Sequence, residues 1–187
     1  SGLEISESKP QISDTDSVLS AIGQGTNNYT TSQLARYVTA VANRGTVYSL
    51  SLIDKTTDSN GKLIKDYTPE VVNQMDEISS STWDLVHNGM ESMVKSSSTF
   101  AGMDISMGGK TGTAQYSKIH ADNVLFVGYA PADSPEISIA VRIANGYAST
   151  YAAEIGRDIT KVYFNPESAD ELLQGYASSL GTAGAGD

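Results

Sequence analysis

Residues 136–145 alternate between large apolar side chains and small or polar ones, and this pattern limits the possible folds more than any other feature of the sequence. The apolar positions are Ile137, Ile139, Val141 and Ile143. Because successive side chains of a β-strand point to opposite faces, one face of this strand must be buried. Residues 123–130 form an expected strand just before it, and the short connection 131–135 predicts antiparallel pairing of the two. A third strand is expected near Ile105–Gln115.

Three helices are expected to cover this sheet. The first begins at Thr30, where Thr30 and Gln33 fit a capping box, and it stops at Gly45. The second runs from about Ser81 to Lys95, and the third spans about Thr150–Phe164. The side chains predicted to face inward are Trp83, Val86, Met90, Met93 and Val94 in the second helix and Ala152, Ile155, Ile159 and Val162 in the third.

The remaining segments complete an α+β fold, an antiparallel sheet covered by helices. Val47–Thr57 and Leu63–Tyr67 have extended patterns, and Asn60-Gly61 between them can adopt the positive φ angles of a type I′ hairpin turn. A short helix is expected over Glu167–Tyr176. We divide the chain into a connecting arm at residues 1–20, a body at 21–166 and a tail at 167–187, whose last seven residues are small and are expected to be flexible.

Composition excludes several classes of function. The net charge of −10 opposes binding to nucleic acid, and no cluster of Lys or Arg offsets it. The chain has no cysteine, and its two histidines, His87 and His120, are far apart, so we expect no metal and no other cofactor. His87 is predicted at the surface or boundary of its helix, and His120 in a loop after the first sheet strand. No apolar run approaches the ~20 residues that span a bilayer, so we expect any membrane anchor to lie outside this chain.

The run Gly108-Gly109-Lys110-Thr111-Gly112-Thr113 falls where a strand is expected, although glycines weaken strand interiors. Such glycines indicate that another backbone or a ligand approaches closely. Lys110 supplies a cation, and Thr111 and Thr113 supply hydroxyls on one face of the strand. These groups suit a carboxylate, and the free edge of a strand can pair with an extended peptide. The alternative is a glycine-rich bend with a solvated lysine.

The neighbours of this run carry a resemblance to a known family. Lys-Thr-Gly is the third motif of serine penicillin-recognising enzymes, beside Ser-x-x-Lys and Ser-x-Asn. Here Thr113-Ala-Gln follows it, then Asn-Val-Leu-Phe-Val-Gly-Tyr-Ala-Pro over residues 123–131. Upstream are Ala-Ile-Gly-Gln-Gly at 21–25, Thr-x-x-Gln-Leu-Ala at 30–35 and Ala-Asn-Arg-Gly at 42–45. From about Gly2 to Phe164 the chain resembles the C-terminal half of the transpeptidase domain of class B (monofunctional) penicillin-binding proteins, which has a serine β-lactamase-like fold.

The chain departs from this family in three ways. Thr31 stands where the family commonly has proline, and Arg44 where it commonly has glycine. More importantly, no suitable nucleophile is present. Three Ser-x-x-Lys matches exist, at Ser6–Lys9, Ser59–Lys62 and Ser92–Lys95, but none is expected at the buried start of a helix, where the lysine can accept the serine proton. Ser-x-Asn is absent from the sequence.

The resemblance implies a serine-type D,D-transpeptidase that cross-links the stem peptides of peptidoglycan and binds β-lactams, on the outer face of the bacterial membrane. It implies that Lys110, Thr111, Gly112 and Thr113 bind substrate, with Lys110 and the backbone N–H of Thr113 in catalytic roles. Implied partners are the missing N-terminal half of the domain and wall-synthesis membrane proteins. We expect the isolated chain to be inactive. Two alternatives stay open, a penicillin-sensing receptor domain and a non-catalytic binding module of the same fold.

Overall fold

The computed structural model describes residues 18–19, 21, 23, 29–115 and 119–173. Its helices are α2 (Thr31–Ala42), α3 (Ser80–Ser96), α4 (Ser149–Phe164) and α5 (Ala169–Leu173), with 3₁₀ turns η1 (Ser98–Phe100) and η2 (Pro166–Ser168). Its strands are β1 (Thr46–Tyr48), β2 (Lys55–Thr57), β3 (Leu63–Asp66), β4 (Val71–Gln74), β5 (Gly108–Ala114), β6 (Asn123–Ala130) and β7 (Ile137–Ile143). Nearly all of the predicted arm at 1–20, and the tail beyond residue 173, lie outside the described residues.

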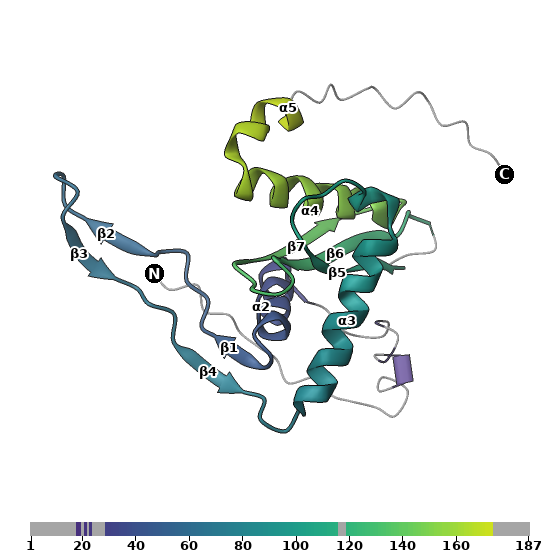
Figure 1. Cartoon of the computed structure of the whole chain (residues 1–187), viewed down its shortest axis with the longest axis horizontal. Coiled ribbons are helices and arrows are strands. Elements are labelled where there is room, and N and C mark those ends of the chain that lie inside the picture. Colours follow the sequence, from purple (N-terminus) through teal and green to yellow (C-terminus); the bar gives the residue numbers. More distant parts are fainter. Residues whose placement is uncertain (1–17, 20, 22, 24–28, 116–118, 174–187) are drawn as a thin grey trace.

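The central element is an antiparallel sheet with the strand order β5-β6-β7. Its α4 face carries Val124 and Phe126, which pack with Ala152 and Ala153 of that helix. On its other face, Tyr129 packs with residues of α2. Figure 1 shows α4 on one side of the sheet and α2 and α3 on the other. The predicted α+β fold and the antiparallel pairing are confirmed.

Helix α2 begins as its sequence predicts. The Thr30 side chain accepts a hydrogen bond from the backbone N–H of Gln33, and the Gln33 side chain accepts one from the N–H of Thr30. This capping box satisfies two N–H groups that have no partner inside the helix. After the helix, Arg44 and Gly45 both take positive φ, at 57° and 104°. Glycine adopts such angles without strain, whereas arginine does not.

Residues 46–74 form an arm that extends away from the body in Figure 1. The predicted hairpin is present as β2 and β3, but β1 pairs instead with β4, a strand that the sequence analysis did not predict. The prediction of a type I′ turn is also wrong. Such a turn needs positive φ at both central residues, and here Gly61 has positive φ but Asn60 does not. The Asp58 carboxylate instead accepts hydrogen bonds from the N–H groups of Asn60 and Lys62, which stabilises a longer loop.

The inner face of α3 differs from the prediction at two positions. Trp83 and Val94 are buried as expected, but Val86 is 39% exposed and His87 only 8% exposed. The His87 ring lies between α2 and the sheet. Its Nε2 is 2.8 Å from the carbonyl oxygen of Val41 in α2, and its ring centroid is 5.3 Å from the ring centroid of Tyr129 in β6. A buried polar ring is acceptable when it has such a hydrogen bond.

Helix α4 turns a different face to the sheet than its large apolar residues suggest. Its buried residues are Ala152, Ala153, Gly156 and Thr160. Ile155 and Ile159, both predicted to face inward, are 43% and 45% exposed. The reason is the ring of Phe126, which lies so close that a Cβ added to Gly156 would be 2.4 Å from it. Only small residues let the helix backbone approach this ring.

Tyr129 gives the fold a testable pH dependence. Its side chain is fully buried and its hydroxyl has no hydrogen-bond partner among the described residues. Burial, with a smaller contribution from the charge of Glu91, raises the pKa of this hydroxyl from 10.0 to about 12. The unfolded chain therefore loses the proton first, and the stabilisation present below pH 10 disappears as the pH rises towards 12.

We expect Tyr129→Phe to remove this pH dependence. At neutral pH the variant should be as stable as the parent or slightly more stable, because a buried hydroxyl without a partner carries an unrecovered desolvation cost. Between pH 9 and pH 11.5 the parent should lose about 2 kcal/mol of unfolding free energy relative to the variant. Urea unfolding at several pH values measures both. Parallel stability curves for the two proteins would contradict the prediction.

Candidate functional site

Strand β5 contains the Lys-Thr-Gly-Thr run and lies at one side of the central sheet. It pairs with β6 along its whole length, from Gly108 opposite Tyr129 to Ala114 opposite Asn123. Within the described residues no strand pairs with its other edge. The predicted strand is therefore confirmed, and one row of its backbone groups faces away from the sheet.

Hydrogen bonds at both ends of β6 show which of its residues direct their backbone groups to β7 and which to β5. The carbonyl oxygens of Asp122 and Ala130 accept hydrogen bonds from the residues around β7, namely Gly146 and Glu136. In an antiparallel sheet, backbone groups alternate between the two edges of a strand. Even-numbered residues of β6 therefore face β7, and odd-numbered ones face β5.

The pairing of β5 with β6 shows which residues of β5 direct their backbone groups to β6. Lys110 lies opposite Val127 and Gly112 opposite Leu125, so these two residues direct their backbone groups to β6. Thr111 and Thr113 then direct their N–H and C=O groups to the open edge. The Lys110 ammonium agrees with this arrangement, because its Nζ donates a hydrogen bond of 2.7 Å to the carbonyl oxygen of Thr111.

The side chains of the run divide between the two faces of the sheet. Thr111 and Thr113 lie opposite Phe126 and Val124, so they share one face of the strand as predicted, and this is the face that α4 covers. Lys110 starts from the other face and returns to the edge at Thr111. Thr111 is half-buried, whereas Lys110 and Thr113 are exposed. The Lys110 cation and the backbone groups of Thr111 and Thr113 therefore lie together at the open edge of β5, and the two threonine side chains are next to them on the α4 face.

The three glycines of β5 differ in the space that a side chain would find at their positions. A Cβ on Gly108 would lie 2.5 Å from the ring of Tyr129, and one on Gly109 would lie 2.7 Å from that of Phe126. These two glycines make room for side chains of the neighbouring strand, which corrects the expectation that a ligand or another backbone approaches there. A Cβ on Gly112 would meet nothing closer than 3.7 Å. Packing within the chain does not explain Gly112, which lies between the two threonines.

The other candidate residues lie away from this edge. Ser59 and Lys62 are in the loop of the arm, and Ser92 and Lys95 are in the last two turns of α3. Ser6 and Lys9 lie outside the described residues. His120 is exposed in the connection between β5 and β6, whereas His87 is buried beneath α2. Among the described residues, no group of three His, Cys, Asp or Glu is placed to hold a metal ion.

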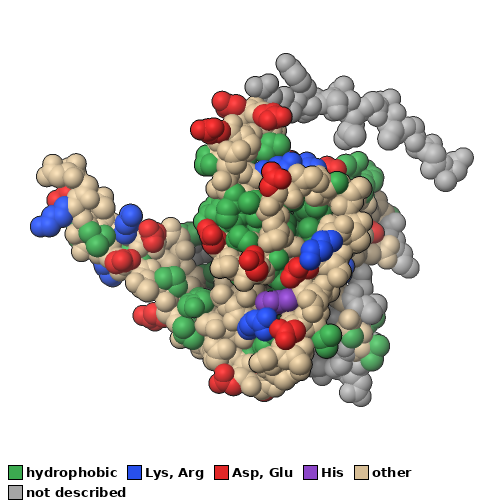
Figure 2. Space-filling view, viewed as in Figure 1, with side chains coloured by type: hydrophobic (Ala, Val, Ile, Leu, Met, Phe, Trp, Pro, Cys, Tyr) green, Lys and Arg blue, Asp and Glu red, His purple; other side chains and the backbone are tan. Residues whose placement is uncertain are grey.

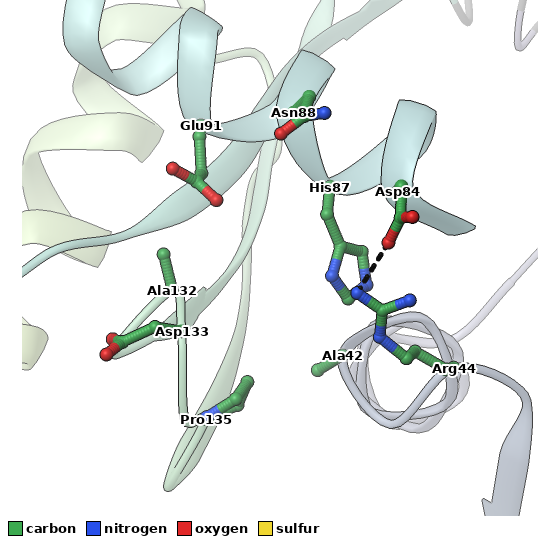
Figure 3. A pocket seen from close by; sticks show the side chains of 9 residues that line it. All are labelled: Ala42, Arg44, Asp84, His87, Asn88, Glu91, Ala132, Asp133 and Pro135. Atoms are coloured by element: carbon green, nitrogen blue, oxygen red, sulfur yellow. Dashed lines mark ion pairs between the residues drawn. The ribbon is translucent and has the colours of Figure 1, made fainter. Parts of the chain in front are cut away.

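Neither of two cavities found in the described part of the chain is lined by Lys110–Thr113. One lies along residues 94–107, between the end of α3 and the start of β5. The other lies between α2, α3 and the β6–β7 turn, and its side chains are drawn in Figure 3. The sequence analysis predicted neither, and the cavity drawn in Figure 3 forms only where segments that are apart in the sequence come together.

Comparison with known proteins identifies the family of the chain. Residues 2–161 match the sequence model of the family described as the penicillin binding protein transpeptidase domain. The chain is 35% identical over 174 residues to penicillin-binding protein 2A of Bacillus subtilis, covering 81% of this chain and 24% of that protein. It is 26% identical over 172 residues to the peptidoglycan D,D-transpeptidase MrdA of Haemophilus influenzae, covering 80% of this chain and 26% of that protein.

Solved structures have the same fold. Penicillin-binding protein 2B from Streptococcus pneumoniae matches with a TM-score of 0.71 and 30% identity, over 83% of this chain and 28% of that one. Penicillin-binding protein A from M. tuberculosis, in its imipenem acyl-enzyme complex, matches with a TM-score of 0.69 and 22% identity, over 79% and 33%. The chain spans about a quarter of the length of the curated relatives named here. It belongs to the penicillin-binding protein transpeptidase family, as a class B transpeptidase region.

Proposed function

We propose that this chain is the C-terminal portion of a peptidoglycan D,D-transpeptidase, an enzyme that cross-links stem peptides through an acyl-serine and binds β-lactams. The observation that carries the proposal is the open edge of β5, to which Thr111 and Thr113 direct their backbone N–H and C=O groups. An extended peptide can bind such an edge as an added strand. Family membership and the β-lactam complexes of its structural neighbours support the same function.

Each group at this edge has a proposed role. The Thr111 and Thr113 hydroxyls hold the carboxylate of the substrate or of a β-lactam. The backbone N–H of Thr113 stabilises the oxyanion that forms when the acyl carbonyl is attacked, together with the N–H of the nucleophile. Lys110 places positive charge beside the reacting groups. Gly112 keeps the strand between the two threonines free of a side chain, so that the peptide can approach its backbone.

The rest of the domain is proposed to cover a face that is exposed in this chain. Four large side chains recur at every fourth residue along the outside of α4, namely Tyr151, Ile155, Ile159 and Tyr163. Figure 2 shows hydrophobic side chains gathered around this helix. Residues spaced by four share one face of a helix, and an exposed apolar face of this kind marks an interface. We assign it to the N-terminal half of the transpeptidase domain, which also supplies the nucleophile.

The proposed location is the extracytoplasmic face of the bacterial membrane, beside wall-synthesis membrane proteins. Relatives named as penicillin-binding proteins and peptidoglycan D,D-transpeptidases support this location. No helix in the described part of the chain is both long and apolar enough to cross a bilayer.

We expect the isolated chain to acquire no covalent label from a fluorescent penicillin. None of its Ser-x-x-Lys matches in the described residues pairs a serine at a helix start with a lysine one turn later, so this part of the chain offers no activated nucleophile. Denaturing gel electrophoresis after incubation gives the readout, with penicillin-binding protein 2A of Bacillus subtilis as the labelled control. Labelling that disappears in Ser92→Ala would show that α3 carries the nucleophile and would overturn this assignment.

A further inference from the structure

The arm of residues 46–74 exposes most of its large apolar side chains. Every residue of β3 and of β4 is exposed, and neither hydrophobic core cluster of the described residues contains a residue of the arm. The aliphatic residues of the arm that are at least 44% exposed are Leu50, Leu52, Ile53, Leu63, Ile64, Val71 and Val72. Because a two-stranded β-ribbon by itself is at best marginally stable in water, a second surface that covers these side chains would stabilise the arm.

Two pairs of these apolar residues lie at irregular positions of the ribbons. Ile64 in β3 and Val72 in β4 fall where the strand register shifts, and each follows another exposed apolar residue, Leu63 or Val71. In a regular strand such neighbours point to opposite faces, whereas a bulge bends the strand and re-aims a side chain. These two pairs are therefore the positions on the arm best suited to contact a partner.

The arm also differs from the rest of the chain in charge. Its charged residues are Lys55, Lys62, Lys65, Asp54, Asp58, Asp66 and Glu70. Three lysines and four carboxylates give the arm a net charge of −1, so the other residues carry −9 of the total of −10. Figure 2 shows basic, acidic and hydrophobic side chains close together along the arm. Two copies of the chain repel each other over most of their surface, but not where arm meets arm.

Most of the charges on the arm have no partner of opposite sign inside the chain. Lys55 and Lys62 form no ion pair among the described residues, and neither do Asp54 and Asp66. A surface with charges of both signs can match a copy of itself, because a two-fold axis brings the same patch of each copy together. Lysines of one arm then meet carboxylates of the other.

We propose that the arm is a dimerisation surface, on which the arms of two copies of this chain pair about a two-fold axis. Leu63, Ile64, Val71 and Val72 of each copy are covered in the dimer, and lysines of one arm face carboxylates of the other. Figure 1 shows that the arm extends away from the rest of the chain, so two arms can meet while the acidic surfaces stay apart. This dimer requires no catalytic residue and is independent of the proposed function.

A second copy fits this surface better than a partner with one sign of charge. A polyanion is repelled by the net charge of −10. A strongly basic partner is attracted to the rest of the chain, which carries −9, more than to the nearly neutral arm. An apolar surface interspersed with charges of both signs matches the arm, and the arm of a second copy is such a surface.

Analytical ultracentrifugation of the full chain over a range of concentrations should show a monomer–dimer equilibrium. Leu63→Ser combined with Ile64→Ser should raise the dissociation constant at least about tenfold, because each copy loses two apolar side chains from the interface. Ile155→Ser combined with Ile159→Ser is the matched control, since these residues are also exposed but lie on α4, and it should change the constant less than about twofold. Circular dichroism shows whether each variant is folded.

A second pair of variants tests the charges. Lys55→Glu combined with Lys62→Glu should also weaken the dimer at least about tenfold, because both arms become acidic and repel each other. Lys95→Glu combined with Arg142→Glu makes the same change of charge at exposed residues outside the arm, and should alter the dissociation constant less than about threefold. A chain that stays monomeric, or a dimer that either arm variant leaves intact, overturns the proposal and leaves the arm to a different partner. Association lost only in the α4 variant would place the interface on α4 and overturn it as well.

Discussion

Replacing Lys110 by alanine, in the complete transpeptidase that we propose contains this chain, should slow acylation by penicillin about 10²–10³-fold. The Lys110 ammonium lies at the open edge of β5, 2.7 Å from the carbonyl oxygen of Thr111. It is therefore beside the backbone groups that the proposal assigns to substrate and oxyanion. Loss of one fixed positive group or donor at a developing charge typically has an effect of this size.

Two further variants make this experiment specific. Lys95→Ala removes an exposed lysine of α3 that pairs with Glu91, and it should leave the acylation rate within about twofold of the parent. Gly112→Ala adds a Cβ that meets nothing closer than 3.7 Å, so the fold should tolerate it while acylation falls. An acylation rate for Lys110→Ala within about threefold of the parent would remove Lys110 from the site. A complete enzyme that penicillin never labels would instead remove the proposed function.

The largest expected effect on stability is at Gly156 in α4. Gly156→Ala should lower the free energy of unfolding by about 3 kcal/mol, near the upper end for overpacking a core. The new Cβ would lie 2.4 and 2.5 Å from two atoms of the Phe126 ring. The ring cannot move aside, because it is fully buried and also fills the space over Gly109 and Gly128.

A second glycine in a helix provides the control. Gly89 lies inside α3, and a Cβ there would meet no atom within 4 Å. Gly89→Ala should therefore stabilise the chain by up to about 1 kcal/mol, the difference in helix propensity between the two residues. Urea unfolding measures both variants. Adding Phe126→Leu to Gly156→Ala should recover part of the loss if the clash is its cause. Equal effects at Gly156 and Gly89 would contradict the packing explanation.

Local patterns predicted the elements well where one segment contains the whole cause. The capping box of Thr30 and Gln33, the strand at 123–130 and the antiparallel pairing of the last two strands all depend on neighbouring residues, and all are confirmed. The predicted type I′ turn was wrong because Asp58 accepts hydrogen bonds from two backbone N–H groups of the loop. Strand β4 was not predicted because its partner, β1, lies more than twenty residues away.

Periodicity also failed to show which face of a helix is buried. In α4 the large residues Ile155 and Ile159 gave the stronger apolar signal, yet the side with Gly156 packs on the sheet. His87 is buried in α3 because a carbonyl of α2 accepts its hydrogen bond. In both helices the decisive contact comes from a distant element, which no spacing within the helix can show.

By itself, the sequence determined the α+β class, the strand that carries Lys110–Thr113 and the resemblance of the chain to penicillin-binding transpeptidases, because these depend on short-range pattern and motif. Tertiary structure alone decided that Gly108 and Gly109 make room for Tyr129 and Phe126, whereas Gly112 does not serve such packing. It also decided that Thr111 and Thr113 direct their backbone groups to an open edge. The physical reason is that free space and free hydrogen-bonding groups depend on which strands and helices lie alongside.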